Sequence, residues 1–534
     1  MELSLFNSDN YRTIPQMARF LHRDSPCPQA PLSGPEWFRL TGGVMAQRPP
    51  ILEYSMNFIP CKPQPDGCTA SRGPHANSLI AVLATAVLAT VVIMATASPA
   101  SAIPAFARKY GTSCVTCHTI YPKLNPFGEA FRRNGYRFPG VDADVVKQDP
   151  VPLGSEAYKK VFPNAVWPAT MAGSLPVAFG ANGQLILHPS KNNAGAAADS
   201  GAQVVFDHLV DEAHLWAGGS FSETVTYFAE LTASGGGIGI EHAMVLFNDL
   251  AGPAHVLNLT VGSFVPTLSS FGPHSSYLAD TLLTTANMTA LFGGVGSVDS
   301  SWATLNNSNG FELNGTIAGS LDYSVGINQG TNVYTRSPDN VYGHVGYKFG
   351  GVRLDAENGS AVPDPMKPWA ENAVTVDLYG FHSSSRFGGG DTGTPLAKDT
   401  ANVAGGLLRG QLGSLELNVG LNLQWHDNVD GKGLHAKSAQ QFGELSYVLY
   451  PWLVPAIRVE NATLTPDGGP AVSDMRIMPG IAALVFPNLK LTLAADIEHA
   501  DGTPPGGWDG VMGMAAGSTK ADIQAVTLAM AYAY

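Results

Sequence analysis

The residues of this chain that most clearly carry chemistry are two cysteines and a histidine in the run Cys114-Val-Thr-Cys117-His118. A thioredoxin-like redox pair needs a βαβ context, which the surrounding sequence lacks, and a zinc site needs a second pair of ligands. Covalent attachment of a c-type haem needs only what is present. The two thiols form thioethers with the haem vinyl groups, and His118 supplies the proximal iron ligand. The run therefore predicts one covalently bound haem c.

An apolar segment upstream predicts export of the chain, and haem c attachment takes place outside the cytoplasm. Leu79–Met94 is an apolar run, and the small residues after it include Ala100-Ser101-Ala102, which fits an A-x-A cleavage site. We therefore expect a signal peptide over residues 79–102. A retained membrane anchor, which needs about twenty apolar residues, is the alternative.

Cleavage before Ile103 changes the cysteine count. The three upstream cysteines are removed, so the mature chain keeps only Cys114 and Cys117, and no second ligand pair for zinc remains. Residues 1–78 are an unassigned extension. They are either a disordered segment or upstream sequence included by a misplaced start, with Met56 as the alternative initiator.

The residues after the motif predict a short helix that covers a porphyrin. Asn125 suits the N-cap, Pro126 suits the first helical position, and Gly135 ends the helix. Phe127 and Phe131 stand one turn apart and share a face, so we expect both rings to lie against the haem. An ordinary miniature aromatic core is the alternative, and the haem would form its centre.

Five basic residues make this segment locally cationic: Arg108, Lys109, Arg132, Arg133 and Arg137. Pairing with haem propionates is one role for them, and a solvated face is the expected role for most.

The sixth iron ligand is left open by the sequence, because no methionine and no second histidine lies between Ile103 and Thr170. Either the position is open or weakly held, or a later residue fills it. The later candidates are Met171, His188, His208, His214 and His242.

From about residue 170 the sequence alternates between apolar and polar residues, which predicts β-strands. Within 414–425 the apolar side chains share one face, and Glu416, Asn418, Asn422 and Gln424 occupy the other. The same period of two appears in 311–317, 321–328 and 488–498. Strands of about ten residues with one apolar and one polar face are typical of a transmembrane barrel, and a soluble sandwich is the alternative.

The C-terminus favours the barrel. Val526, Leu528, Met530, Tyr532 and Tyr534 alternate down to an aromatic final residue, as in outer-membrane proteins. Short turns alternate with longer polar loops over the last third, so the last strand should end on the periplasmic side. This alternation of short and long connections fails around residues 350–400, so the strands predicted there are one too few or one too many.

We thus predict an all-β transmembrane barrel of about 16 antiparallel strands, in the outer membrane of a Gram-negative-type bacterium, with a small α-helical c-type cytochrome segment at its N-terminus. The expected domains are the monohaem segment over 103–150, a linker over 151–169 and the barrel over 170–534. A charged fraction of 14 % agrees with a barrel, and the net charge of -13 argues against nucleic acid as a partner. No nucleophile elbow, zinc pair or phosphate loop supports hydrolytic catalysis.

The run FARKYGTSCVTCHTIYPKLNPFGEAFRRNGY, followed by a porin-like barrel, resembles the outer-membrane monohaem cytochrome–porin fusions of iron-oxidising bacteria. The specific match covers this run, and the barrel matches in pattern. The resemblance implies that Cys114 and Cys117 hold the haem, that His118 ligates the iron, and that residues of the following helix cover it: Leu124, Phe127 and Phe131. Where clear iron-oxidising members carry another histidine shortly after the motif, this chain has Thr119, Ile120 and Tyr121.

The same resemblance implies electron transfer from extracellular Fe(II) to a periplasmic c-type cytochrome, an Fe(II):cytochrome c oxidoreductase activity. A single haem cannot span an apolar band about 25 Å tall, so it must lie in the lumen or plug one mouth. Inward charges are expected either to hold that plug or to line a wet lumen: Glu312, Asp322, Glu416, Arg458, Glu460, Asp496 and Glu498.

Other functions stay open at this point. They are a haem-plugged porin with a gating or sensing role, a conduit for a different extracellular donor or acceptor, and a haem enzyme with an open distal site.

Overall fold

The computed structural model describes most of the chain after residue 104. The described residues are 105–140, 176–188, 203–271, 274–278, 307–329, 339–357, 366–387, 397–428, 433–502 and 520–534, without 207 and 236, together with 146, 151–152, 160 and 170–171. The predicted extension over 1–78 and the predicted signal peptide over 79–102 lie outside the described residues.

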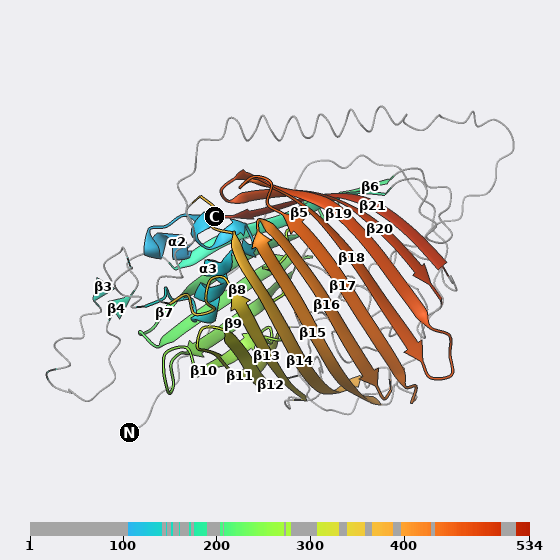
Figure 1. Ribbon diagram of the computed structural model, residues 1–534, viewed down its shortest axis with the longest axis horizontal. Helices are drawn as coiled ribbons and strands as arrows, with labels where there is room; N and C mark the ends of the chain where they lie inside the picture. Colours follow the sequence, from blue (N-terminus) through green and yellow to red (C-terminus); the bar gives the residue numbers. More distant parts are fainter. Residues whose placement is uncertain are drawn as a thin grey trace, which may run out of the picture. The chain divides into compact units, whose positions relative to one another are not determined.

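One closed antiparallel sheet dominates these residues (Figure 1). Its strands are β5 (Val177–His188), β6 (Gln203–Val205), β7 (Glu212–Ser220), β8 (Val225–Ser234), β9 (Gly237–Phe247), β10 (Asn258–Phe264), β11 (Ser308–Ile317), β12 (Leu321–Asn328), β13 (Asn340–Gly350), β14 (Glu371–Phe387), β15 (Ala397–Gly413), β16 (Leu415–His426), β17 (Ala436–Tyr447), β18 (Leu453–Pro466), β19 (Val472–Phe486), β20 (Leu489–Asp501) and β21 (Lys520–Ala533). Short β6 and β7 pair with opposite halves of β5, so together they fill one position. The barrel therefore has sixteen strand positions, as predicted.

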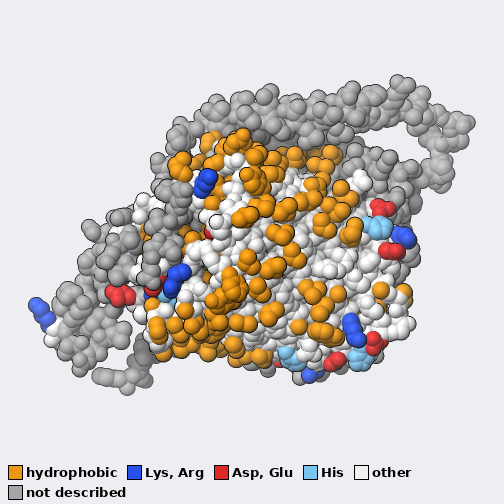
Figure 2. Space-filling model, in the orientation of Figure 1, with side chains coloured by type: hydrophobic (Ala, Val, Ile, Leu, Met, Phe, Trp, Pro, Cys, Tyr) orange, Lys and Arg blue, Asp and Glu red, His pale blue; other side chains and the backbone are white. Residues whose placement is uncertain are grey.

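The apolar and polar residues that alternate along the strands also alternate between exposed and buried positions. In β16, Gln424 is completely buried whereas Leu421 is 46 % exposed. Figure 2 shows the consequence: hydrophobic side chains cover the outer face of the strands, and charged side chains gather at its margins. A soluble sandwich buries its apolar faces, so this inverted arrangement confirms a transmembrane barrel, and barrels of this kind belong to the bacterial outer membrane.

The uncertain stretch around residues 350–400 contains one long strand. The 17-residue β14 pairs with β13 over 340–350 and with β15 over 397–413. It separates two long connections, 351–370 and 388–396. The sequence does not show the correct number of strands here, because these two connections adjoin a strand whose last residues include the polar run Ser383–Arg386 before Phe387.

One end of the barrel, which we call the C-terminal mouth, contains the end of β21 and most of the shorter connections. β7 and β8 are joined by 221–224, β15 and β16 by Ser414 alone, and β19 and β20 by 487–488. Most connections at the other end are longer, such as 427–435 and 502–519. Short turns are typical of the periplasmic side, so the C-terminal mouth faces the periplasm.

The segment before the barrel contains two short α-helices and one small pair of strands. It contains α2 (Ala105–Tyr110), the 3-10 turn η1 (Cys114–Thr116), β1 (His118–Ile120), β2 (Lys123–Leu124) and α3 (Pro126–Arg133). As predicted, α3 has Asn125 as N-cap and Pro126 at its start, and Gly135 (φ +69°) follows its end. We call residues 105–140 the plug. Among the described residues, no helix is long and apolar enough to cross a membrane.

Two short strands between plug and barrel form a separate pair. β3 (Val151–Pro152) pairs with β4 (Thr170–Met171), so the first barrel strand starts at Val177 rather than at residue 170.

The connection between β10 and β11 turns into the lumen. We call its described residues, 265–271 and 274–278, the inner loop. Leu268 and Phe271 are buried against the aromatic side chains of the wall, and Ser270 Oγ donates to Asp377 Oδ2 at 2.5 Å. Ser276 Oγ donates to Glu444 Oε2 at 2.8 Å. The inner loop therefore lines the barrel from inside, and it reaches the plug.

Removal of the last residue should impair assembly of the barrel. Tyr534 exchanges two backbone hydrogen bonds with Phe179 of β5, at 2.8 and 2.6 Å, where the last strand meets the first. We expect deletion of Tyr534, or Tyr534→Asp, to lower the fraction of heat-modifiable, folded protein in isolated outer membranes, while Tyr534→Phe stays near wild type. Wild-type amounts of folded protein for the deletion variant would contradict this prediction.

Candidate functional site

The predicted haem motif, Cys114–His118, begins with a tight turn that follows helix α2 in the plug. Cys117 N donates to Cys114 O at 3.2 Å, which closes η1, and the hydroxyls of Thr112 and Thr116 lie 2.5 Å apart. Cys114 and Cys117 are both half-buried free thiols. The turn therefore keeps two thiols and the following histidine together on one short segment.

Asn125 joins this turn to helix α3. Its Oδ1 accepts from Gly128 N at 2.9 Å as an N-cap, and its Nδ2 donates to the carbonyls of Val115 and Thr116 at 3.0 and 3.1 Å. The helix lies so close that a Cβ on Gly128 would be 2.0 Å from Cys117 O. Glycine is therefore required there, and the helix fixes the position of the motif.

His118 is held in one tautomer. Its Nδ1 lies 3.0 Å from Pro122 O, and a carbonyl only accepts, so Nδ1 carries the proton and Nε2 the lone pair. Burial lowers the pKa of His118 to about 4, although the backbone carbonyls of Pro122 and Lys123 oppose this. The imidazole is thus neutral at neutral pH, as a metal ligand must be.

The two thiols do not have the properties of a redox pair. Burial raises the pKa of Cys114, and burial together with the neighbouring Cys114 raises the pKa of Cys117 to about 12. A thioredoxin-like pair requires a lowered thiol pKa. The site therefore agrees with the exclusion of that chemistry.

Phe127 and Phe131 lie in a buried aromatic cluster beside the motif. Phe131 packs edge-on against Phe106, with ring centroids 5.2 Å apart, and Phe127 against Phe138 at 5.1 Å. Cys117 packs against the same cluster. Leu124, on β2, is also buried. The miniature core that the sequence allowed is present, and contact of these side chains with a haem stays a prediction.

Ion pairs hold the plug to the barrel wall. Glu129 of α3 binds Arg409 of β15 at 2.5 Å, and Arg409 also binds Glu416 of β16 at 3.1 Å. Lys123 binds the same Glu416 at 2.6 Å, and Arg133 binds Asp322 of β12 at 3.0 Å. We call these six residues the plug–wall ion network.

The network is buried, and it extends to the inner loop. Lys123 Nζ donates to Ser275 O at 2.5 Å, and Leu124 N donates to His274 O at 2.9 Å. Burial alone would raise the pKa of Glu129, but Arg409, Arg133 and Lys123 lower it to about 2. Glu129 is therefore ionised at any physiological pH.

Two of the predicted solvated residues face carboxylates instead. Arg133 is 13 % exposed in its ion pair with Asp322, and Arg137 is 12 % exposed at 2.9 Å from Asp249, between β9 and β10. The solvated-face interpretation is wrong for both, because the plug is enclosed by a wall that carries acidic partners.

The inward charges of the sequence divide between plug, inner loop and wall. Asp322 and Glu416 bind the plug. Glu312 accepts from Thr267 N of the inner loop at 2.9 Å, and Arg458 Nη2 donates to Ser276 Oγ at 2.6 Å. Glu460 and Asp496 contact Arg476 within the wall.

The candidate distal ligands are scattered. Met171 lies in β4, His188 at the end of β5, and His208 pairs with Asp211 at 3.0 Å. His214 and His242 both contact Glu230, at 2.9 and 3.0 Å.

A further histidine, His274 of the inner loop, was missed. Its backbone carbonyl accepts from Leu124 N of the plug, and its side chain is exposed. Nothing in the sequence marks it, because its position depends on the inner loop turning into the barrel.

Comparison with known proteins gives structural likeness only. No family model matches the chain, and no curated protein does. Among solved structures, the chain is similar to OmpT, an outer membrane protein of Vibrio cholerae, at 11 % identity and TM-score 0.43, covering 67 % of this chain and 99 % of that one. It is also similar to an anion-selective porin from Comamonas acidovorans, at 13 % identity and TM-score 0.43, covering 67 % and 99 % of the two chains.

Loss of the central arginine of the network should destabilise the plugged barrel. Arg409→Met leaves Glu129 and Glu416 buried without their shared partner, so we expect the free energy of unfolding in detergent to fall by about 3–5 kcal/mol. Arg353→Met is the control, because Arg353 lies in a connection and is 35 % exposed in its pair with Asp355; we expect a loss of at most about 1 kcal/mol. Equal losses in the two variants would contradict a structural role for the network.

Protection of the plug against proteolysis should fall at acid pH, because Glu129 loses its charge there. Its folded pKa of about 2 lies below its ordinary 4.5. Its ion pairs therefore stabilise the fold fully above about pH 4.5, and this contribution is lost as the pH falls towards 2. Limited proteolysis should find the plug equally protected between about pH 5 and 8 and less protected below that range. Glu129→Gln should remove this pH dependence, and a steep change near neutral pH would be inconsistent with the network.

Proposed function

We propose that this protein is an outer-membrane c-type cytochrome joined to a porin-like barrel, and that it transfers electrons from an extracellular reductant to a periplasmic c-type cytochrome. Fe(II) is the leading candidate for the reductant. The observation that carries the proposal is the place of the haem motif, inside the C-terminal mouth of the barrel. A redox group at this mouth lies between the lumen and the periplasm, where a single carrier is needed.

The residues of the plug fit a covalently bound haem. Cys114 and Cys117 are free thiols on one turn, and His118 keeps its lone pair on Nε2 because Nδ1 is bound to Pro122. The aromatic cluster beside Cys117 provides an apolar environment. A bound haem supplies one-electron oxidation and reduction of its iron at this place.

Two further residues are suited to complete the haem site. Arg132 lies near Tyr136 and His274, and among the described residues it is engaged in no ion pair, unlike Arg133 and Arg137. It is the side chain we expect to bind a propionate. His274 joins the candidates for the distal iron ligand, because its backbone carbonyl accepts from Leu124 of the plug and its side chain is exposed.

Firm attachment of the plug favours electron transfer over gating. A gate must leave the mouth at low cost, whereas three plug residues, Lys123, Glu129 and Arg133, are buried in ion pairs with the wall. Breaking a buried ion pair costs several kcal/mol. The haem-plugged porin with a gating or sensing role is therefore the second candidate function.

Rapid mixing of the oxidised protein with Fe(II), at acidic and neutral pH, should show haem reduction in the visible spectrum. Without His118 the iron loses its proximal ligand, so His118→Ala should keep the thioethers but lose the normal spectrum.

Mass spectrometry is the control for this experiment, and it should find one haem on Cys114 and Cys117 in a chain that starts at Ile103. An unmodified cysteine pair would overturn the cytochrome assignment. Reduction by other extracellular reductants but not by Fe(II) would overturn the iron assignment and keep the conduit. A conducting pore with no electron transfer would favour the gating porin.

A further inference from the structure

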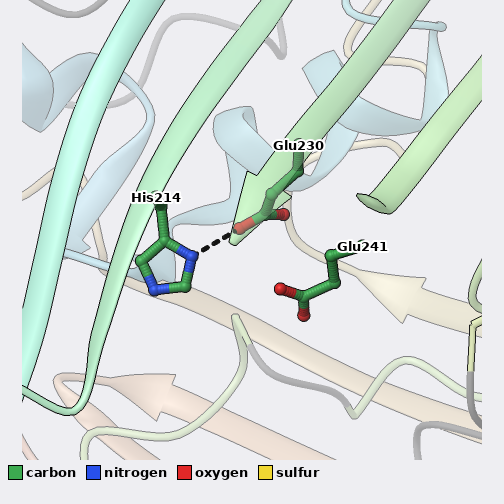
Figure 3. Close-up of side chains that lie close together, drawn as sticks. All are labelled: His214, Glu230 and Glu241. Carbon is green, nitrogen blue, oxygen red and sulfur yellow. Dashed lines mark ion pairs between the residues drawn. The ribbon is translucent and has the colours of Figure 1, made fainter. Parts of the chain in front are cut away.

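Three side chains on adjacent strands form a cluster on the barrel wall, outside the plug. His214 of β7, Glu230 of β8 and Glu241 of β9 each offer one ligand atom, and these atoms lie within 4.8 Å of one another (Figure 3). Their strand neighbours Leu215 and Leu231 are exposed on the outer face, so the cluster belongs to the lumen side. We call these three residues the wall cluster.

A β-bulge adds Glu241 to the wall cluster. The pairing of β8 with β9 shifts register between Glu230 and Leu231. Such a bulge re-aims a side chain, so Glu241 and its neighbour His242 both meet lumen-side residues of β8. Glu241 accepts from Thr232 Oγ1, and His242 Nδ1 lies 3.0 Å from Glu230 Oε2.

The histidine of the wall cluster is oriented as a metal ligand. His214 Nδ1 faces Glu230 Oε1 at 2.9 Å. On the other side of the ring, Nε2 lies 3.4 Å from Asn182 Oδ1 and 3.5 Å from Glu212 Oε2. Metal-bound histidines commonly have their second ring nitrogen bound to a carboxylate or carbonyl in this way.

We propose that His214, Glu230 and Glu241 bind a divalent transition-metal cation. One imidazole nitrogen and two carboxylate oxygens suit Fe(II), Mn(II) or Zn(II) and do not suit a soft cation such as Cu(I). The two carboxylates also balance the charge of a divalent cation. The identification of Fe(II) as the physiological occupant rests on the proposed function.

Aromatic rings connect the wall cluster to the haem motif. His214 stacks on Trp216, with ring centroids 5.2 Å apart and an interplanar angle of 4°. Trp216 meets Tyr121 of the plug at 6.4 Å, and Tyr121 meets His118 at 5.4 Å. Tyr121 therefore gives the plug an aromatic contact to the barrel wall.

Trp216 has a fixed place in this series of rings. It is hydrogen-bonded to Glu230 of the wall cluster. A Cβ on Gly180 of β5 would lie 2.0 Å from its ring, so glycine at that position makes room for the indole. The indole therefore contacts both the proposed cation ligands and the plug.

The redox step at this site balances without a chemical bond being formed or broken. Fe(II) bound at the wall cluster would supply one electron and become Fe(III), and a haem held by Cys114, Cys117 and His118 would accept that electron by one-electron reduction. The Fe(III) product must then leave the cluster towards the lumen.

Mn(II) is the probe for the site in the purified, haem-loaded full-length protein. Its free-ion EPR signal at room temperature disappears on binding, which gives a dissociation constant directly. We expect Glu241→Gln and His214→Gln each to raise this constant by at least about tenfold, because loss of an indirect partner of a metal already costs about that much. His499→Gln is the matched control, since His499 also pairs with a carboxylate, Asp522, and lies on β20 away from the cluster. Folding of each variant is checked by heat-modifiable migration and by the haem spectrum.

Two results would overturn the site: Mn(II) binding that both cluster variants leave unchanged, or equal losses in the cluster variants and in His499→Gln. Fe(II) mixing then separates this inference from the proposed function. Mn(II) binding that depends on the cluster, in a wild-type protein whose haem Fe(II) does not reduce, would support the site and contradict the proposed Fe(II) oxidation. Haem reduction by Fe(II) at the wild-type rate in both cluster variants would contradict the cluster as the donor site and leave the proposed function standing.

Discussion

The buried carboxylate of Glu129 between Arg409 of the wall and Arg133 of the plug is the contact on which the arrangement of this mouth depends. A buried charge is tolerated only when it is paired, so the plug is stable where the wall supplies cations to Glu129 and anions to Lys123 and Arg133. Because α3 approaches the motif turn through Asn125 and Gly128, fixing this helix also fixes Cys114, Cys117 and His118 relative to the barrel. A single set of ion pairs thus turns a short peptide with a haem motif into a defined part of the barrel.

The barrel and the local form of the plug could be predicted from the sequence, because both depend on patterns between near neighbours. Alternation along 414–425 was enough to assign the outward leucines and the buried Glu416 and Gln424. The N-cap Asn125 and the helix end at Gly135 were predicted for the same reason. The thickness of the membrane limits the predicted position of the plug to the lumen or one mouth, because a single haem cannot span the apolar band.

The partners of the plug could not be predicted, because each depends on which strands face it in the closed barrel. Arg409 is far from Glu129 in the sequence, and the acidic partners of Arg133 and Arg137 lie on β12 and after β9, so these arginines resembled an ordinary solvated face. The position of His274 could be predicted only if the inner loop was known to turn into the barrel. The wall cluster required a bulge in β9, which shifts Glu241 out of the simple alternation.

In the function that we propose, the barrel insulates one redox group, with the donor side in the lumen and the acceptor side at the C-terminal mouth. The most direct test uses proteoliposomes that carry oxidised cytochrome c inside and the full-length protein in the bilayer, with the longer loops outside. Fe(II) added outside should reduce the trapped cytochrome c with the wild-type protein and not with His118→Ala, whose barrel is the same and which therefore reports leakage of Fe(II). Equal reduction with the two proteins, or none with either, would contradict electron transfer through the plug.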